Sequence, residues 1–124
     1  LTLILVLISS CKKKGKDPEP VKMGAYQGSF ISSAHPTSGI AYINNNRTSL
    51  EFQNFMSDSG PDLNIYLAAD INNITSDYID LGDIKGLNGN YSYDVNSSTD
   101  FSKYKYVVVW CVDFDVNFGY ALLN

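Results

Sequence analysis

The side chains best suited to chemistry in this 124-residue sequence are two cysteines, Cys11 and Cys111, and a single histidine, His35. One histidine excludes the histidine clusters of zinc enzymes, and no serine, histidine and aspartate triad follows from the order of the residues. A cysteine does redox or nucleophilic chemistry when its thiolate is populated and reachable. We therefore examine the surroundings of Cys111, for which His35 is the one conceivable cationic partner.

The neighbours of Cys111 predict a buried and slow thiol. Asp113 lies two residues away on the same side of an extended strand, and its carboxylate disfavours the thiolate. Lys105 shares that side, but six residues of strand place it roughly 20 Å away. Because free cysteine is among the most buried residue types, two interpretations stand. Cys111 is either a small core residue beside Trp110, or a redox thiol with Trp110 or a tyrosine as relay.

The stretch 104–123 around Cys111 predicts two antiparallel strands, because a single strand of that length exceeds the usual size. We expect the chain to reverse around residues 113–117. At period two, every even-numbered residue is apolar or aromatic, so the even face is predicted to form the core. That face comprises Tyr106, Val108, Trp110, Val112, Phe114, Val116, Phe118, Tyr120 and Leu122.

Composition and turn signals predict an all-β fold for residues 25–124. Glycine, asparagine, serine and tyrosine are abundant, which is typical of short strands joined by tight turns. Turns are expected at residues 44–46 and at Asn88 with Gly89, where a hairpin is predicted, and a helical turn at 100–103. We expect a single antiparallel β-sandwich or flattened barrel of about eight short strands. The first six strands are expected near residues 25–31, 39–43, 48–55, 63–69, 78–85 and 91–95.

The N-terminal segment predicts secretion and lipidation. Residues 1–10 are apolar and uncharged, too short to span a bilayer but of the length of a signal-peptide core whose start is missing. Residues 8–11, Ile-Ser-Ser-Cys, resemble the lipobox of bacterial lipoproteins, which implies a lipid on Cys11. The alternative is an ordinary signal cleavage site, which leaves Cys11 free to pair with Cys111 or with another chain. We expect the bacterial cell envelope, with lipid anchoring to a membrane, on the periplasmic side or the cell surface.

Residues 11–24 are predicted to form a disordered tether that begins at the lipidated cysteine. Lysines, prolines and Gly15 leave nothing to bury there, and the basic run either contacts anionic lipid head groups or is simply solvated. Without Lys12, Lys13, Lys14, Lys16, Asp17 and Glu19 the net charge of -4 becomes about -6, so nucleic acid is not an expected partner. No motif identifies a cofactor, and the scattered aspartates lack the spacing of a calcium loop, so no metal site is predicted.

Short motifs spread over residues 28–121 carry a family resemblance. They include the loop Gly60, Pro61 and Asp62, and the final Trp110 and Cys111. The remaining matches are Gly28, Ser29, Phe30, His35, Ser38, Gly39, Leu50, Phe52, Asn54, Phe55, Leu63, Tyr66, Leu67, Lys85, Gly86, Gly89, Asn90, Tyr93, Tyr104, Val107, Val108, Val109, Phe114, Phe118 and Gly119. In this order the sequence resembles the electron-transfer DM-thirteen domain, an extracytoplasmic module found with DOMON domains in Skeletor-like animal proteins and alone in bacterial proteins.

The resemblance implies a β-sandwich-like fold and a redox role for the cysteine at position 111. This chain also departs from the family pattern. The family often has a basic residue shortly after that cysteine, whereas this chain has Val112 and Asp113. The departure disfavours an activated thiol.

Two functions of different class follow from these observations. The first is a membrane-anchored extracytoplasmic lipoprotein domain with a redox or electron-transfer role through Cys111, with Trp110 and His35 as site residues. The second is a non-enzymatic surface module that binds protein or glycan, because nine tyrosines supply large contacts with polar tips. Neither predicts a stand-alone enzyme. The expected partners are the membrane, through the lipid on Cys11, and a redox or surface protein.

Overall fold

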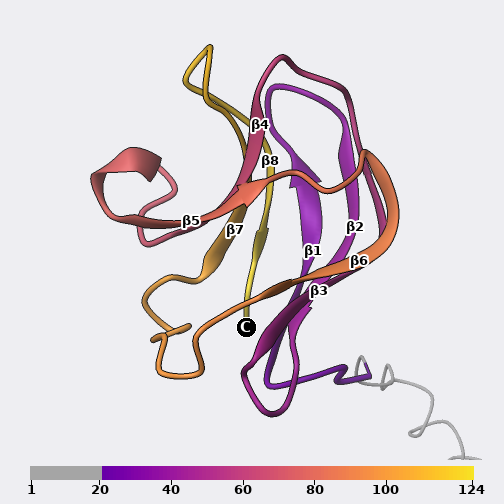
Figure 1. Ribbon diagram of the computed structural model, residues 1–124, viewed down its shortest axis with the longest axis vertical. Helices are drawn as coiled ribbons and strands as arrows, with labels where there is room; N and C mark the ends of the chain where they lie inside the picture. Colours follow the sequence, from indigo (N-terminus) through magenta and orange to yellow (C-terminus); the bar gives the residue numbers. More distant parts are fainter. Residues whose placement is uncertain (1–20) are drawn as a thin grey trace, which may run out of the picture.

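The computed structural model describes residues 21–124, which form a single curled β-sheet (Figure 1). The predicted signal segment, Cys11 and all but the last few tether residues lie outside the described residues. The sheet has eight strands, and a short 3₁₀ helix, η1, precedes β5. Their bounds are β1 (Tyr26–Ser32), β2 (Thr37–Ile43), β3 (Ser49–Ser57), β4 (Leu63–Ala68), η1 (Ile74–Ser76), β5 (Tyr78–Asp83), β6 (Asn88–Asp94), β7 (Tyr106–Cys111) and β8 (Val116–Leu122).

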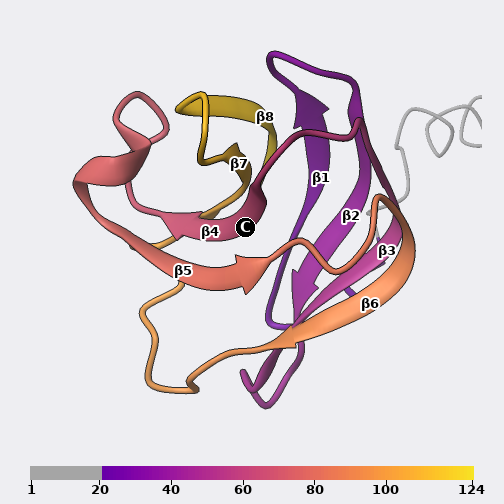
Figure 2. The same cartoon turned by 45° about the horizontal axis from the view of Figure 1, so that its top comes forward.

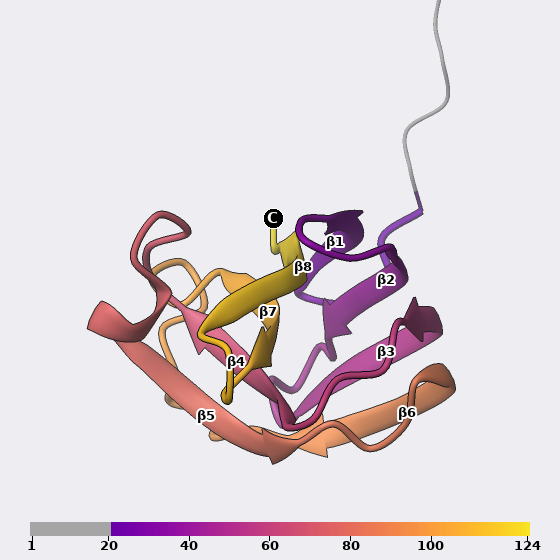
Figure 3. The ribbon, with the colours of Figure 1, turned by 90° about the horizontal axis from the view of Figure 1, so that it is seen from above.

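Every strand pair is antiparallel, and the order across the sheet is β5-β4-β7-β8-β1-β2-β3-β6. The sheet rolls up until its two edge strands approach each other, which gives a nearly closed barrel (Figures 2 and 3). The predicted all-β fold is confirmed. No helix of residues 21–124 is long and apolar enough to cross a membrane.

The predicted turn at residues 44–46 joins β2 to β3. The side-chain oxygen of Asn44 accepts hydrogen bonds from the backbone N–H groups of Thr48 and Ser49, at 2.8 and 3.2 Å. Arg47 adopts the left-handed conformation there, with φ 61°. An asparagine side chain that satisfies the following backbone donors is the local reason why the chain reverses at this point.

The hairpin predicted at Asn88 and Gly89 is wrong. Both residues lie within β6, which pairs with β3 and not with the preceding strand β5. Gly89 has φ 113° and lies opposite Phe55, beside a register shift in which Asn54 also has a positive φ. The glycine therefore serves a bulge between two paired strands, which requires the same conformational freedom as a turn.

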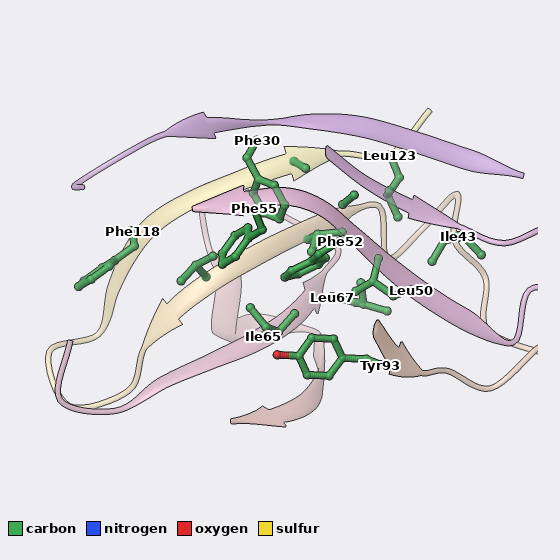
Figure 4. Packing of buried hydrophobic residues seen from close by; sticks show 14 of the residues in the cluster. Phe30, Ile43, Leu50, Phe52, Phe55, Ile65, Leu67, Tyr93, Phe118 and Leu123 are labelled. Carbon is green, nitrogen blue, oxygen red and sulfur yellow. The ribbon is translucent and has the colours of Figure 1, made fainter. Parts of the chain in front are cut away.

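The main core fills the inside of the barrel (Figure 4). Aromatic residues of β1, β3 and β6 pack there at ring-centroid distances of 4.8 to 6.1 Å. Strand β7 contributes Val107, Val109 and Cys111. The other fully or largely buried members are Phe30, Ala41, Ile43, Leu50, Phe52, Phe55, Leu63, Ile65, Leu67, Tyr93, Phe101, Phe118, Ala121 and Leu123.

The prediction that the even face of residues 104–123 forms the core is wrong for the main core. The odd-numbered residues of β7 face the barrel interior, whereas Val108 and Trp110 belong to a second cluster. That cluster also contains Tyr66, Ala68 and Ile74, so the connection from β4 to β5 helps to cover it. Because both faces of β7 are buried, the alternation of apolar residues does not tell them apart.

The parity also changes between the two strands of this hairpin. A register shift after Val109 places Phe118 in the main core, although its number is even. Phe114 is 65% exposed in the turn, and Leu122 is 40% exposed. A bulge adds one residue to one strand and so reverses which numbers point inward.

Two tyrosine hydroxyls close the barrel between the edge strands β5 and β6. The hydroxyl of Tyr93 accepts the N–H of Lys85 at 2.9 Å and donates to the carbonyl of Asp83 at 3.2 Å. Tyr91 donates to the carbonyl of Gly86 at 2.6 Å. Burial raises the pKa of both phenols above the usual 10.0, so they are neutral donors.

Candidate functional site

Three loops meet at one end of the barrel, and we call them the apical loops: residues 32–36, 58–62 and 112–117 (Figure 1). They precede β2, precede β4 and connect β7 to β8. The contacts that join them are Val112 N–H to Asp62 O at 2.8 Å, Ala34 N–H to Asn117 O at 3.1 Å, and His35 Nδ1 to Asp58 Oδ2 at 3.0 Å. The fold thus gathers predicted site residues that are far apart in the sequence.

Cys111 is the last residue of β7 and is completely buried in the main core. It lies opposite Leu63 on β4 and Val116 on β8, and its thiol is free. The predicted burial of this thiol is confirmed. Since attack on a disulfide requires a reachable thiolate sulfur, the folded domain does not present Cys111 for thiol exchange.

His35 lies at the same end of the barrel but is directed elsewhere. Its ring stacks on Phe118, with centroids 3.9 Å apart and an interplanar angle of 27°. Its Nδ1 pairs with Asp58, and its backbone N–H donates to the carbonyl of Phe118 at 3.1 Å. Among residues 21–124 no hydrogen bond joins His35 to Cys111. The imidazole therefore acts here as a half-exposed cover over Phe118.

The loop Gly60, Pro61 and Asp62 holds the end of β7 in place. A Cβ atom at Gly60 would lie 2.9 Å from the Phe118 ring and 3.0 Å from the Leu63 side chain, so only glycine lets the loop approach them this closely. The carbonyl of Asp62 accepts the N–H of the residue that follows Cys111. This loop has a positioning role and directs no side chain at the thiol.

Trp110 is 8% exposed and lies on the outer face of β7, where it continues a stack of aromatic rings. Its ring centroid is 6.1 Å from that of Tyr66 on β4, at an interplanar angle of 23°. Tyr66 in turn stacks on Tyr78 of β5 at 4.4 Å and 21°. Tyr78 is 40% exposed, so this aromatic stack of three rings leads from solvent to the residue bonded to Cys111.

The sequence did not identify Tyr66 and Tyr78 as partners of Trp110. Twelve positions separate the two tyrosines, and they meet because β4 and β5 pair around a register shift. Nothing in single-sequence alternation specifies that register. The available signal was only that aromatic residues occur in each of the three strands, which a buried β-sheet face explains equally well.

Burial, the carboxylate of Asp80 and the phenol of Tyr78 together raise the pKa of Tyr66 to about 12. Tyr66 is therefore a neutral phenol at physiological pH. Asp80 is fixed opposite Tyr66 on β5, where it accepts hydrogen bonds from the Asn64 amide at 3.1 and 3.2 Å and from the N–H of Gly82 at 2.8 Å. The Asp80 carboxylate is therefore held by Asn64 and Gly82, and it acts on Tyr66 through its charge.

Cys111 and the aromatic stack are connected through the strand itself. Successive side chains of a β-strand point to opposite faces, so Trp110 faces outward and Cys111 faces the barrel interior. Only one peptide unit separates their Cα atoms. The backbone therefore links the buried thiol directly to the aromatic stack, whose outer ring is accessible to solvent.

The described residues offer no metal centre: in the range 21–124, no group of three or more histidine, cysteine, aspartate and glutamate side chains is placed to hold a metal ion. The site therefore consists of a thiol, aromatic rings and carboxylates.

Comparison with known proteins supplies one family. A family model described as Electron transfer DM13 matches residues 29–123, which include all eight strands apart from the first residues of β1. No curated protein and no solved structure matches the chain. Since the family model covers more than half of the sequence and the whole barrel core, the chain belongs to the electron transfer DM13 family.

Proposed function

We propose that this chain is a membrane-anchored, extracytoplasmic electron-transfer domain in which one electron at a time passes between Cys111 and the surface through Trp110, Tyr66 and Tyr78. The observation that supports the route most directly is the aromatic stack, with ring centroids 4.4 and 6.1 Å apart. It begins at a half-exposed ring and ends next to the cysteine. Family membership supports electron transfer as the class of function.

The burial of Cys111 favours one-electron chemistry over thiol exchange. Oxidation of the thiol to a thiyl radical removes one electron and one proton, and neither step requires a bulky partner at the sulfur. The electron passes to Trp110 and along the stack to an oxidised partner at Tyr78, and the proton leaves to solvent at the end of the barrel where β7 ends. Re-reduction returns one electron and one proton. Tyrosine, tryptophan and thiol groups all need a strong oxidant, so the partner is a high-potential one-electron centre such as a ferryl haem.

The anchoring part of the proposal rests on the sequence of residues 1–16. An uncharged apolar run, small residues, Cys11 and then lysines occur in the order of a lipoprotein signal. A lipid on Cys11, with a short tether, would hold the barrel close to the membrane outside the cytoplasm. The lysines after Cys11 would add attraction to anionic lipids.

The route is tested by oxidising the full chain in detergent with a photogenerated ruthenium(III) complex and counting the remaining Cys111 thiol after denaturation. Tyr66→Phe keeps the shape of the ring and Trp110→Phe keeps a smaller aromatic ring, but each raises the barrier to hole transfer at that step. We expect each to slow the loss of the Cys111 thiol by about tenfold or more, which corresponds to about 1.4 kcal/mol of barrier.

Tyr120→Phe is the matched control, because Tyr120 lies on the same outer face but outside the stack. Equal rates of thiol loss in Trp110→Phe, Tyr66→Phe and Tyr120→Phe would contradict the proposed route.

A non-enzymatic binding module is the second candidate, and one observation favours it. Phe114 is 65% exposed in the turn between β7 and β8, where an aromatic side chain contributes nothing to the core. Exposed aromatic residues are typical of protein contacts. If none of the stack variants changes the oxidation of Cys111, this second function is favoured.

A further inference from the structure

The apical loops carry negative charge alone. Their five, five and six residues contain no lysine or arginine, and the one histidine is paired with an aspartate. Their acidic residues are Asp58, Asp62, Asp113 and Asp115. The hydrogen bonds between the three loops bring these carboxylates to one end of the barrel, where they form a surface of one sign.

An exposed apolar group lies within this acidic surface. Phe114 is 65% exposed and Val112 36% exposed, and both belong to the turn after Cys111. Asp115 closes the turn in the left-handed conformation with φ 52°. A large exposed aromatic with charged residues around it has the composition of a contact centre with a polar rim.

The apical loops also face away from the point where the chain would be anchored. Lys22 and the C-terminal Asn124 lie together at the other end of β1, where Asn124 pairs with Gln27. The seven residues of β1 separate the two ends by about 20 Å at the usual rise of a strand. A lipid on Cys11 would therefore leave the apical loops free for a partner.

We propose that the apical loops are the docking surface for a positively charged redox protein, which takes Phe114 into an apolar pocket and surrounds it with lysine and arginine side chains. This inference rests on the proposed electron-transfer function, for which it names the partner class. Charge complementarity identifies the class of partner that would bind the apical loops. An acidic surface repels anionic lipid and nucleic acid, whereas it attracts a basic protein during diffusional encounter. Docking here would place this partner at the end of β7 that carries Cys111, whereas Tyr78 lies at the other end of β4, opposite Ala68. The basic protein would therefore exchange electrons at the Cys111 end, and the oxidised partner of the proposed route at the Tyr78 end.

The test measures binding of a basic ferric c-type cytochrome to the full chain, with an acidic c-type cytochrome as the comparison probe. Trp110 is the only tryptophan of the chain, so haem quenching of its fluorescence reports the complex. The basic cytochrome is expected to bind with an affinity that falls as salt rises, and the acidic cytochrome is expected not to bind.

Two variants address the surface. Phe114→Ser removes the apolar centre and should weaken binding by about tenfold or more, as for an interface anchor. The double variant Asp113→Asn, Asp115→Asn should weaken it by about twofold to thirtyfold at low salt, since exposed ion pairs contribute about 0.2 to 1 kcal/mol each. Asparagine also tolerates the left-handed conformation of position 115.

A charge-matched control separates a docking surface from general attraction. Asp70 and Asp94 are exposed at the opposite end of the barrel, and Asp70→Asn, Asp94→Asn changes the net charge by the same amount. This control should change the affinity by less than about twofold at the same salt. Equal weakening by both double variants, tight binding of the acidic cytochrome, or unchanged binding of Phe114→Ser would each overturn the proposal. Urea midpoints of all variants check that they are folded.

Failure of this proposal is distinct from failure of the electron route. Photo-oxidation of Cys111 by the ruthenium complex in solution requires no docked protein. If docking fails while that reaction depends on Trp110, the route stands and the partner surface is elsewhere. If docking holds while the reaction ignores Trp110, the surface belongs to a binding module.

Discussion

Gly119 of β8 offers the sharpest test of how the apical end is built. A Cβ atom at this position would overlap the side chain of Thr37 and lie 2.9 Å from the carbonyl of Ile31. The Thr37 hydroxyl it would displace is 3.0 Å from the carbonyl of His35 and 3.2 Å from that of Phe118. Gly119→Ala therefore forces strand β1 and its following loop away from β8.

The expected cost has two parts. Overpacking a tight site costs about 1 to 3 kcal/mol, and losing a buried hydrogen bond of Thr37 costs about 1 kcal/mol. Gly119→Ala should therefore lower the free energy of unfolding by about 2 to 4 kcal/mol, a large fraction of the 5 to 15 kcal/mol typical of single domains. Urea denaturation followed by Trp110 fluorescence measures this difference.

Gly86→Ala is the matched control, because its Cβ would meet nothing closer than 3.4 Å, an ordinary van der Waals contact. A second check is the double variant Gly119→Ala, Thr37→Ala, in which the overlapping side chain is shortened. The double variant should be less destabilised than the sum of the two single variants. Equal midpoints for Gly119→Ala and Gly86→Ala, or strict additivity in the cycle, would refute the reasoning.

Four further outcomes are expected. Trp110→Ala should lower the free energy of unfolding by about 3 to 5 kcal/mol, because a largely buried indole is removed, and a wild-type urea midpoint would contradict its burial. Iodoacetamide should label Cys111 far more slowly in the folded domain than a free cysteine peptide at pH 7, whereas rapid labelling with a thiol pKa well below about 8.5 would show an activated thiol. Tyr66, with its pKa raised to about 12 from 10.0, favours the folded state below pH 10. Its contribution is lost as the pH rises from 10 through 12, because the unfolded chain releases the proton first. Alkaline difference spectroscopy should thus lose one late-titrating phenol in Tyr66→Phe. Cys11→Ala should leave the membrane fraction, and retention there would argue against lipid anchoring.

Much of the fold could be predicted because its information is local. All eight expected strands overlap observed strands, and the asparagines before Arg47 form a turn whose bonds are made by neighbouring residues. The burial of Cys111 could be predicted because free cysteine is among the most buried residue types, and Val107 and Val109 accompany it inward.

What could not be predicted depends on pairing between distant segments. Gly89 has the freedom that a turn or a bulge needs, and only the contact with Phe55 decides between them. The inner and outer faces of β7 are both apolar, so only the cover supplied by Ile74 distinguishes the Trp110 side. The aromatic stack likewise depends on the register of β4 and β5, which no local pattern specifies.

The closure of the barrel by Tyr91 and Tyr93 has a consequence for its motions. Other neighbouring strands are joined by ladders of backbone hydrogen bonds, whereas β5 and β6 are held by side-chain hydroxyls and by the connector between them. Separating β5 from β6 breaks far fewer hydrogen bonds than separating any other pair of neighbouring strands. The barrel should therefore open transiently between these two strands without unfolding. The amide proton of Lys85, whose acceptor is the Tyr93 hydroxyl, should then exchange early, while those of β7 exchange only with global unfolding. Small solutes that enter while β5 and β6 are apart would reach the interior of the barrel without passing the apical loops.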